Sequence, residues 1–145
     1  MHIRPFEPED QAAIEQLQEE GMAELDVLTP AGYFDDLASI AEAFEGGVFL
    51  VAEIEGAAAG MGGLTPEGEV VRMRVSASYR RQGIALALLN QLVERARALE
   101  MKRVFLHTLV SQQAAQNLYL KYGFHEAGRG KLHGNHVVAY ALELN

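Results

Sequence analysis

Hydrophobic and polar residues near the N-terminus follow the spacing of one strand and two helices. An apolar stretch at residues 2–6 predicts a strand, and the Pro8-Glu9-Asp10 triplet after it is typical of a helix start. Residues 10–25 place apolar side chains every three or four positions, which predicts an amphipathic helix. A second helix is expected after Pro30, up to the Gly46-Gly47 pair. The residues spaced for burial on it are Phe34, Leu37, Ala38, Ala41 and Phe44.

The middle of the chain changes to short apolar runs separated by turn residues. Residues 48–54, 57–64 and 69–75 each predict a strand, and the tight turns between them indicate an antiparallel meander. The glycine-rich stretch 56–63 lacks the Lys-Ser/Thr ending of a nucleotide-binding loop and does not open a helix. We therefore interpret it as a hairpin and a small-residue strand, in which the glycines permit close packing or close substrate approach.

Helical and strand patterns alternate again toward the C-terminus. Residues 84–100 predict a helix, and the strand-like run 104–110 is expected to lie parallel to the strand before that helix. A further helix is expected at 111–122, capped by Ser111 and ended by Gly123. The last predicted strands are residues 124–128 and 136–144. Together these elements predict a mixed α/β fold, with a central, mostly antiparallel sheet flanked by four helices.

Length and composition limit the classes of protein that fit. With 145 residues the chain is expected to form one domain, residues 1–145, with a real hydrophobic core. It has no signal-peptide pattern and no apolar run of about 18 residues, so we expect a soluble cytoplasmic protein without membrane contact. The absence of cysteine excludes disulfides, a thiol nucleophile and cysteine metal sites.

Charge is distributed unevenly along the chain. Residues 1–69 hold 16 acidic residues and one basic residue, whereas residues 70–145 hold 4 acidic and 11 basic residues. The basic half suits a polyanionic ligand, and the acidic half favours a cationic acceptor and disfavours nucleic acid. The alternative interpretation is that the acidic residues only form solvated helix faces.

The most informative segment is the loop between the strand 69–75 and the helix that begins near Ile84. It contains Arg80, Arg81 and Gly83. A loop that opens a helix presents backbone N–H groups without helical partners, and the helix dipole adds positive potential there. Glycine lets the backbone approach a ligand closely. The segment therefore predicts an anion site, most naturally for a pyrophosphate.

The histidines give weaker signals. His107 lies within an apolar strand, where a hydrogen-bonded core histidine is expected rather than a catalytic one. His133 and His136 have the spacing of a metal pair, but no third ligand lies near them in the sequence, so we do not predict a zinc site. The family resemblance described next implies instead that both of them line the acceptor pocket.

Two motifs resemble those of the GNAT superfamily of acyl-CoA-dependent N-acyltransferases. The loop Arg80-Arg81-Gln82-Gly83-Ile84-Ala85 is similar to that family's R/Q-x-x-G-x-G/A signature, and residues 115–124 are similar to its A-x-x-L-Y-x-x-x-G-F pattern. About 35 residues separate the motifs, with a helix and a strand between them. The resemblance covers nearly the whole chain, and it implies a GNAT-like fold with acetyl-CoA as co-substrate and no metal.

The resemblance assigns particular residues to the cofactor. The strand end at Met73, Arg74 and Val75 would face the pantetheine arm, where a bulge in the family separates this strand from the next. The amides of residues 81–85 would hold the pyrophosphate. Gln112 stands where the family often has asparagine, next to the pantetheine. The cofactor residues implied in full are Met73, Arg74, Val75, Arg80, Arg81, Gln82, Gly83, Ile84, Ala85, Gln112 and Tyr122.

Catalysis by such an enzyme requires few specialised groups, because a thioester is already activated. A backbone N–H near Val75 is able to stabilise the oxyanion, and an ammonium acceptor needs a base. Glu69 is the candidate base, against the alternative of a solvent-exposed strand end. Tyr119 is the candidate acid that protonates the departing thiolate, against the alternative of core packing. Tyr122, one helical turn away, is the fallback for that role.

The function predicted from the resemblance is acetyl transfer to a primary amine by direct attack in a ternary complex, since no cysteine can carry the acyl group. The acceptor is expected to be a small cationic molecule or a protein amine. Its pocket would be shaped by residues 26–35, with Tyr33 and Phe34 as walls. The alternatives are a non-catalytic acyl-CoA-binding sensor and an oligomeric scaffold. A homodimer paired through the terminal strand is a further expectation.

Overall fold

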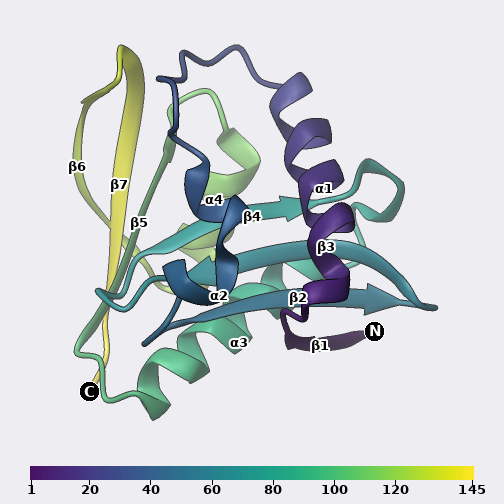
Figure 1. Cartoon of the computed structure of the whole chain (residues 1–145). Helices are drawn as coiled ribbons and strands as arrows, with labels where there is room; N and C mark the ends of the chain where they lie inside the picture. The colour runs from purple at the N-terminus through teal and green to yellow at the C-terminus, as the bar shows by residue number, and fades with distance from the viewer.

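A computed structural model describes all residues, 1–145, as seven strands and four α-helices with three short 3-10 segments (Figure 1). Their order along the chain is β1 (His2–Pro5), η1 (Pro8–Asp10), α1 (Gln11–Ala23), η2 (Asp35–Ala38), α2 (Ile40–Ala43), β2 (Val48–Ile54), β3 (Ala57–Leu64), β4 (Val70–Val75), η3 (Ala77–Tyr79), α3 (Ile84–Ala98), β5 (Arg103–Leu109), α4 (Gln113–Tyr122), β6 (His125–Leu132) and β7 (Asn135–Glu143). The predicted mixed α/β fold is confirmed.

The strands form two antiparallel sheets that touch at one point. One sheet has the order β1-β2-β3-β4, and the other has the order β5-β7-β6. A single parallel bridge joins Glu69 to Phe105, where the Phe105 N–H donates to Gly68 O at 3.0 Å. The expected parallel pairing of residues 104–110 with the preceding strand is thus limited to that bridge. Beyond it β5 pairs with β7, so β4 and β5 separate.

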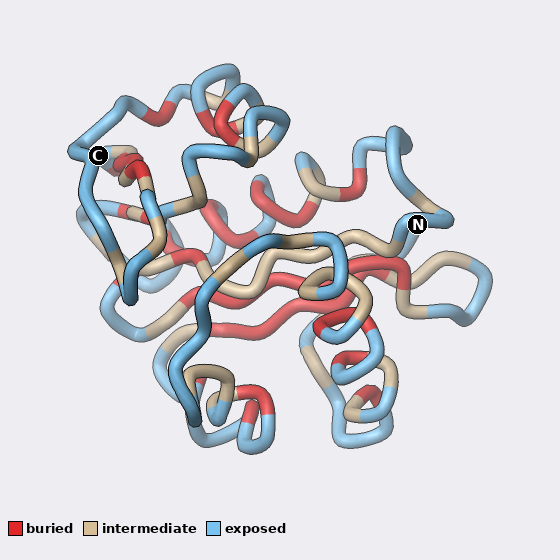
Figure 2. Tube along the Cα trace, turned by 90° about the horizontal axis from the view of Figure 1, so that it is seen from above, coloured by how far each residue is buried: buried red, intermediate tan, exposed pale blue.

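The hydrophobic core lies on both faces of the β1–β4 sheet. Helix α3 covers one face with a stripe that includes Leu88, Leu89 and Leu92, all fully buried. Helix α1 and the segment from η2 to α2 cover the other face. Figure 2 shows the buried strands running between these two layers of helix. No helix has both the length and the apolar composition needed to cross a lipid bilayer.

The predicted helix after Pro30 is wrong in extent. The structure has only η2 and the four-residue α2 there, and Ser39 breaks the path with φ −143° and ψ 54°. Leu37 and Ile40 are buried, whereas Ala38 and Ala41 are exposed, so the spacing shifts at the break. The backbone of the segment is hydrogen-bonded through short turns, such as Leu37 N–H to Phe34 O at 3.0 Å. Side-chain contacts with β4, described below, also hold it.

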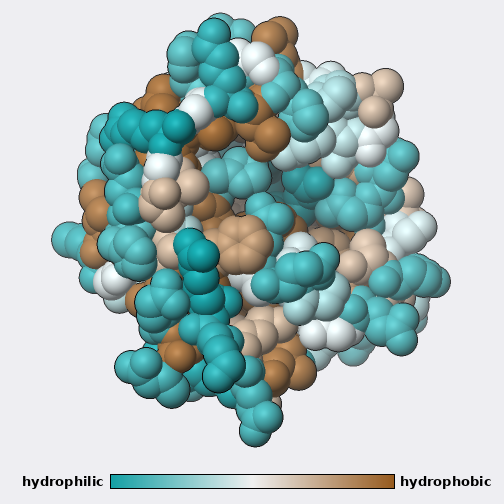
Figure 3. Space-filling model, turned by 90° about the vertical axis from the view of Figure 1, so that its left-hand side faces the viewer, coloured by the Kyte–Doolittle hydropathy of each residue, from teal (hydrophilic) through white to brown (hydrophobic).

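The side of the molecule that carries β6 and β7 is mostly hydrophilic, with apolar side chains scattered among polar ones (Figure 3). All residues of β6 except Leu132 are exposed. The strand also carries an ion pair between Arg129 and Glu126, at 2.9 Å. A homodimer formed through the C-terminal strands stays a prediction.

Glycines in β3 allow the sheet to pack closely against its neighbours. A Cβ built at Gly63 would lie 2.5 Å from Phe44 Cε1 and 3.0 Å from Phe49 Cδ2, both in buried rings. Gly62 has a similar close approach, to Met73 Sδ at 2.5 Å. The close packing expected of this glycine-rich strand is therefore present.

Gly63→Ala is expected to lower the free energy of unfolding by about 1–3 kcal/mol, because the added methyl overpacks the Phe44–Phe49 contact. Gly130→Ala is the matched control, since a Cβ at Gly130 in β6 would meet nothing within 4 Å. Urea denaturation of both variants measures the difference. Equal stability of the two variants would contradict the packing argument.

Candidate functional site

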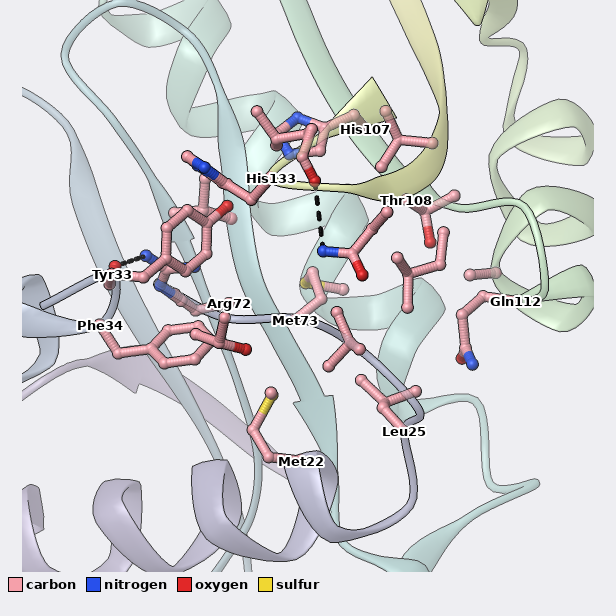
Figure 4. Close-up of a pocket in the computed structure, with 18 of the residues that line it drawn as sticks. Met22, Leu25, Tyr33, Phe34, Arg72, Met73, His107, Thr108, Gln112 and His133 are labelled. Carbon is pink, nitrogen blue, oxygen red and sulfur yellow. Dashed lines mark hydrogen bonds between the residues drawn. The ribbon is translucent and has the colours of Figure 1, made fainter. Parts of the chain in front are cut away.

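A cleft of about 430 Å³ opens where β4 and β5 separate. Its walls come from β4, β5, the first turns of α4, the β6–β7 turn and the segment that follows α1. Figure 4 shows Tyr33, Phe34 and Arg72 on one side of this cleft, with His107 and Thr108 on β5 and Gln112 at the far end. The predicted acceptor walls, Tyr33 and Phe34, both line it.

A bulge in β4 produces the separation of the strands. The register against β3 shifts between Met61 and Gly63, and Arg72 has a left-handed φ of +59°. A non-glycine residue in this conformation costs free energy, and such residues gather at functional sites. The bulge turns the end of β4 away from β5, as the family resemblance implied.

Arg72 fastens the segment after α1 to this bulge. Its guanidinium donates two hydrogen bonds to the carboxylate of Asp36, both 3.0 Å, and a third to Tyr33 O at 3.0 Å. It also stacks over the rings of Tyr33 and Phe34, at 5.1 and 4.6 Å from their centroids. Sequence reasoning missed this residue, because its partners lie 36 to 39 positions away.

Glu69 and His107 face each other in the cleft. Glu69 Oε2 lies 3.2 Å from His107 Nδ1, and their side chains are 26% and 33% exposed. The expectation of a core histidine at position 107 is therefore wrong. Strand alternation explains the error, because Val104 and Leu106 point into the core and the residue after them points away. A carboxylate and an imidazole in contact at a half-exposed site form a plausible route for a proton.

Tyr119 lies on the face of α4 that borders the cleft, and it also belongs to the core. Its ring packs against Phe124 and Tyr140, with centroids 5.9 and 6.0 Å away. Burial raises the pKa of Tyr119 to about 12, while the positive charge of Arg74 acts in the opposite direction. The phenol is therefore protonated at neutral pH.

Tyr122 lies outside the cleft. Its hydroxyl donates to Asn90 Oδ1 on α3 at 3.0 Å, and burial raises the pKa of this phenol too. The Tyr122 hydroxyl therefore does not reach the cleft that Tyr119 borders. A role for Tyr122 in cofactor binding or catalysis stays a prediction, with less geometric support than that of Tyr119.

The loop between β4 and α3 exposes a series of backbone N–H groups. Helical bonding begins with the Ala87 N–H to Gly83 O at 3.0 Å, so the amides of residues 81–86 have no backbone acceptor. Gly83 and Arg81 have φ values of +78° and +64°, which curve the backbone at this point. Such a concave set of amides at a helix start is an anion-binding arrangement. It includes the predicted positions Gln82, Ile84 and Ala85.

The two arginines of this loop differ in their surroundings. The Arg80 guanidinium forms an ion pair with Glu24 at the end of α1, and this contact holds the pKa of Glu24 below its usual value. Glu20 on the same helix accepts the Ala77 N–H at 2.7 Å. Arg81 is exposed. Of the two predicted phosphate ligands, Arg81 is thus the one not engaged with α1.

The remaining predicted cofactor residues divide between core and cleft. Met73 and Val75 pack against the core under α3, and Met73 also lines the cleft. Gln112 is the N-cap residue of α4 and lines the cleft. Neighbouring Gln116 was not predicted; its buried amide donates to Leu109 O and Val110 O, at 3.2 and 2.8 Å, and so fixes the end of β5 against α4.

Apart from Glu69, the acidic residues that motivated a cationic acceptor are absent from the cleft. Asp26, Asp35 and Asp36 lie on the expected segment, but none of them lines it, and Asp36 is occupied by Arg72. His133 lines the cleft beside Tyr33, with ring centroids 5.2 Å apart. His136 does not line it, contrary to expectation. Glu69 is the one carboxylate in the lining.

The fold is thus an α/β domain whose two sheets separate between β4 and β5, with unpaired backbone amides in the loop that follows β4. The chain belongs to the acetyltransferase (GNAT) family, whose family model matches residues 12–124. The resemblance seen in the two sequence motifs is confirmed by this match.

Individual relatives agree with the family assignment. The chain is 33% identical over 106 residues to N-acetyltransferase 8F1 of Mus musculus, an alignment that covers 65% of this chain and 48% of that protein. It is 36% identical over 76 residues to the chloroplastic GCN5-related N-acetyltransferase 6 of Arabidopsis thaliana, covering 52% and 26%. The chain therefore spans less than half the length of these curated relatives.

Solved structures share the fold. A GNAT-family acetyltransferase from Staphylococcus aureus Mu50 superposes with a TM-score of 0.88 and 20% identity, covering 99% of each chain. The acetyltransferase yncA from Salmonella typhimurium, solved with its cofactor acetyl-CoA, superposes with a TM-score of 0.83 and 19% identity, covering 100% of this chain and 94% of that one.

Proposed function

We propose that the protein transfers the acetyl group of acetyl-CoA to a primary amine by direct attack. The observation that carries this proposal is the cleft between β4 and β5, which lies beside a loop whose amides at 81–86 are free. A cofactor with a pyrophosphate and a narrow arm suits such a pair of sites. Membership of the acetyltransferase (GNAT) family supports the same conclusion.

Residues of the loop and of β4 would hold acetyl-CoA. The amides of 81–85 and the Arg81 side chain would bind the pyrophosphate, since they combine unpaired N–H groups with positive charge. The backbone at Met73 to Val75 and the side chain of Gln112 would face the pantetheine arm. The thioester supplies an activated acyl group, so the protein has mainly to align the amine and move protons.

Glu69 and His107 would prepare the amine for attack. The acceptor arrives mainly as an ammonium ion, and Glu69 would accept a proton from it, directly or through water. The contact with His107 at 3.2 Å offers a path for that proton toward solvent, because the imidazole is one-third exposed. The nitrogen lone pair then forms the bond to the acetyl carbon.

Collapse of the resulting intermediate breaks the bond between carbon and sulfur. An N–H near Val75 would stabilise the oxyanion, and the Tyr119 hydroxyl would donate a hydrogen bond to the departing thiolate. The nitrogen, now bonded to the acetyl carbon, gives up its second proton, and this proton or one from solvent converts the thiolate to the CoA thiol. The products are the acetylated amine and CoA. Every protein group in these reaction steps, except the backbone N–H donor, is a side chain that lines the cleft.

A non-catalytic acyl-CoA sensor remains the alternative. It would need the phosphate loop but neither Glu69 nor Tyr119 in the cleft, whereas both line it. Release of free CoA thiol from acetyl-CoA in the presence of an amine panel separates the two functions. Cofactor binding without thiol release under any condition would favour the sensor.

Acetyl-CoA and CoA, but not ATP, are expected to raise the melting temperature of the protein. A ligand at 100 times its Kd adds about 2.7 kcal/mol to the free energy of unfolding.

Arg81→Ala should weaken CoA binding about tenfold, because one charge-assisted contact to phosphate is lost. Isothermal titration calorimetry measures the affinity for CoA of the unchanged protein and of Arg81→Ala.

Arg95→Ala is the matched control, because Arg95 is an exposed arginine of α3 that lies far along the helix from the loop. It should bind CoA with the affinity of the unchanged protein. Equal weakening in both variants would indicate only general electrostatic attraction. No shift of the melting temperature with acetyl-CoA or CoA would overturn the proposed function itself.

A further inference from the structure

One arginine of the cleft, Arg74, has no counter-ion in contact with it. Two arginines, Arg72 and Arg74, line it together with one carboxylate, Glu69. Arg72 is neutralised by Asp36 through two hydrogen bonds, and Glu69 is in contact with His107. Arg74 is left as the cationic group of the cleft without a carboxylate partner among its contacts.

The guanidinium of Arg74 is poorly satisfied by the protein. Nη1 donates to Met73 O at 3.0 Å, and Nη2 lies 3.6 Å from Met22 Sδ, which is a weak acceptor. Its Nε is buried and has no hydrogen-bond partner. A buried charged group without a counter-ion is costly, and burial lowers the pKa of this guanidinium.

The fold directs this side chain into place. Gly21 on α1 has no Cβ, and a Cβ built there would lie 2.5 Å from Arg74 Cδ and 2.8 Å from its Nε. The stem of Arg74 therefore crosses α1 where the helix presents only backbone. Met22, next to Gly21, supplies the sulfur contact and also lines the cleft. The guanidinium is held at the cleft wall by packing rather than by an ion pair.

We infer that Arg74 binds an anionic group on the acceptor, so that the acceptor is a small primary amine that also carries a carboxylate or a similar acid group. This inference rests on the proposed acetyl transfer and names its substrate class. It replaces the expectation of a purely cationic acceptor. An ammonium-rich molecule would place further positive charge beside a guanidinium that already lacks a counter-ion.

The rest of the cleft fits a small acceptor with an apolar body. Met22, Leu25, Leu28, Phe34, Leu132 and Val137 contribute apolar lining. The Leu28 N–H donates to Asn135 Oδ1 at 2.7 Å, and Asn135 Nδ2 donates to Leu28 O at 2.6 Å. These two bonds join the segment after α1 to the β6–β7 turn, so the cleft is bridged on that side. A free amino acid fits such a space better than an extended protein chain.

The inference is tested with matched acceptors that differ only in the acid group. Leucine, methionine and phenylalanine are compared with 3-methylbutylamine, 3-(methylthio)propylamine and 2-phenylethylamine, and release of CoA thiol gives kcat/KM for each. We expect at least tenfold higher kcat/KM for at least one acid than for its amine. Amines preferred in every pair, or no turnover with any acid, would overturn the inference.

Variants of Arg74 test whether its guanidinium causes the preference for acids over the matching amines. Arg74→Met keeps an unbranched apolar stem but lacks the guanidinium, and it should lower kcat/KM for the acid at least tenfold more than for the matching amine. Arg74→Lys should retain part of the preference, while Arg95→Met should leave it unchanged. An equal loss for acid and amine would mean that Arg74 serves the departing thiolate, and would overturn the inference.

Cofactor binding separates this test from that of the proposed function. Calorimetry with acetyl-CoA should give the same Kd for Arg74→Met as for the unchanged protein. A large rise in that Kd would assign Arg74 to the cofactor instead of the acceptor. Failure of the unchanged protein to bind acetyl-CoA would defeat the proposed function, whereas binding with acetylation of acid-free amines alone would defeat only the inference.

Discussion

Replacing Glu69 by glutamine is expected to lower kcat/KM by about 10²- to 10³-fold, the usual contribution of a positioned base. Glutamine keeps the size of the side chain and one acceptor oxygen, but it cannot take a proton from an ammonium ion. The place of Glu69 beside the β4 bulge, 3.2 Å from His107, depends on the parallel bridge to Phe105 and should survive the change. Release of CoA thiol from acetyl-CoA in the presence of an accepted amine gives kcat/KM for both proteins.

Three further variants test the role of Glu69. Glu67→Gln removes an exposed carboxylate from the turn two residues earlier and should leave kcat/KM unchanged. His107→Gln should lower the rate, and the double variant should be little worse than Glu69→Gln alone if the pair passes one proton. An unchanged kcat/KM in Glu69→Gln would assign the base to another group.

Local patterns in the sequence located most of the framework. The boundaries of β2 and β3 follow from turn residues and apolar runs, and α1 and α3 follow from helical spacing. The loop between β4 and α3, with its unpaired amides, was predictable for the same reason, because a strand, a glycine and a helix start lie within a dozen residues. Each of these features is decided by neighbours in the chain, so a single sequence carries the signal.

The contacts that shape the cleft depend on residues far apart in the sequence. Arg72 contacts Asp36 only because the β4 bulge turns the Arg72 side chain toward the segment after α1. No local sequence pattern predicts this contact. His107 could have been placed correctly by extending the strand alternation through Leu106, which would have put it beside Glu69.

The uneven charge of the two halves has a structural meaning different from the one expected. Acidic residues of α1 hold the basic loop, since Glu24 pairs with Arg80 and Glu20 accepts the Ala77 N–H. Asp36 in turn holds Arg72. Part of the acidic half is thus used to position basic residues around the cleft rather than to attract a cationic substrate.

Tyr119→Phe is expected to lower kcat by roughly 10- to 100-fold with little change in the Kd for acetyl-CoA. The pKa of about 12 keeps the hydroxyl protonated from pH 6 to 9, so the group is always ready to donate. A thiol near the cysteine value of about 8.5 is a stronger acid, so complete transfer from an unassisted phenol is unfavourable. The hydroxyl then acts mainly by a charge-assisted hydrogen bond to the developing thiolate, worth about 1.5–3 kcal/mol.

The pH dependence distinguishes this role from an ordinary titrating acid. Because the folded-state pKa is raised, loss of the Tyr119 proton lies near pH 12, and no alkaline limb below about pH 10 should come from this group. Tyr122→Phe tests the fallback acid on the same helix. Its hydroxyl binds Asn90 outside the cleft, so its loss should lower kcat less than the loss of the Tyr119 hydroxyl. An unchanged kcat in Tyr119→Phe would reduce Tyr119 to a packing residue against Phe124 and Tyr140, and the thiolate would then have to leave by solvent protonation or with the help of Arg74.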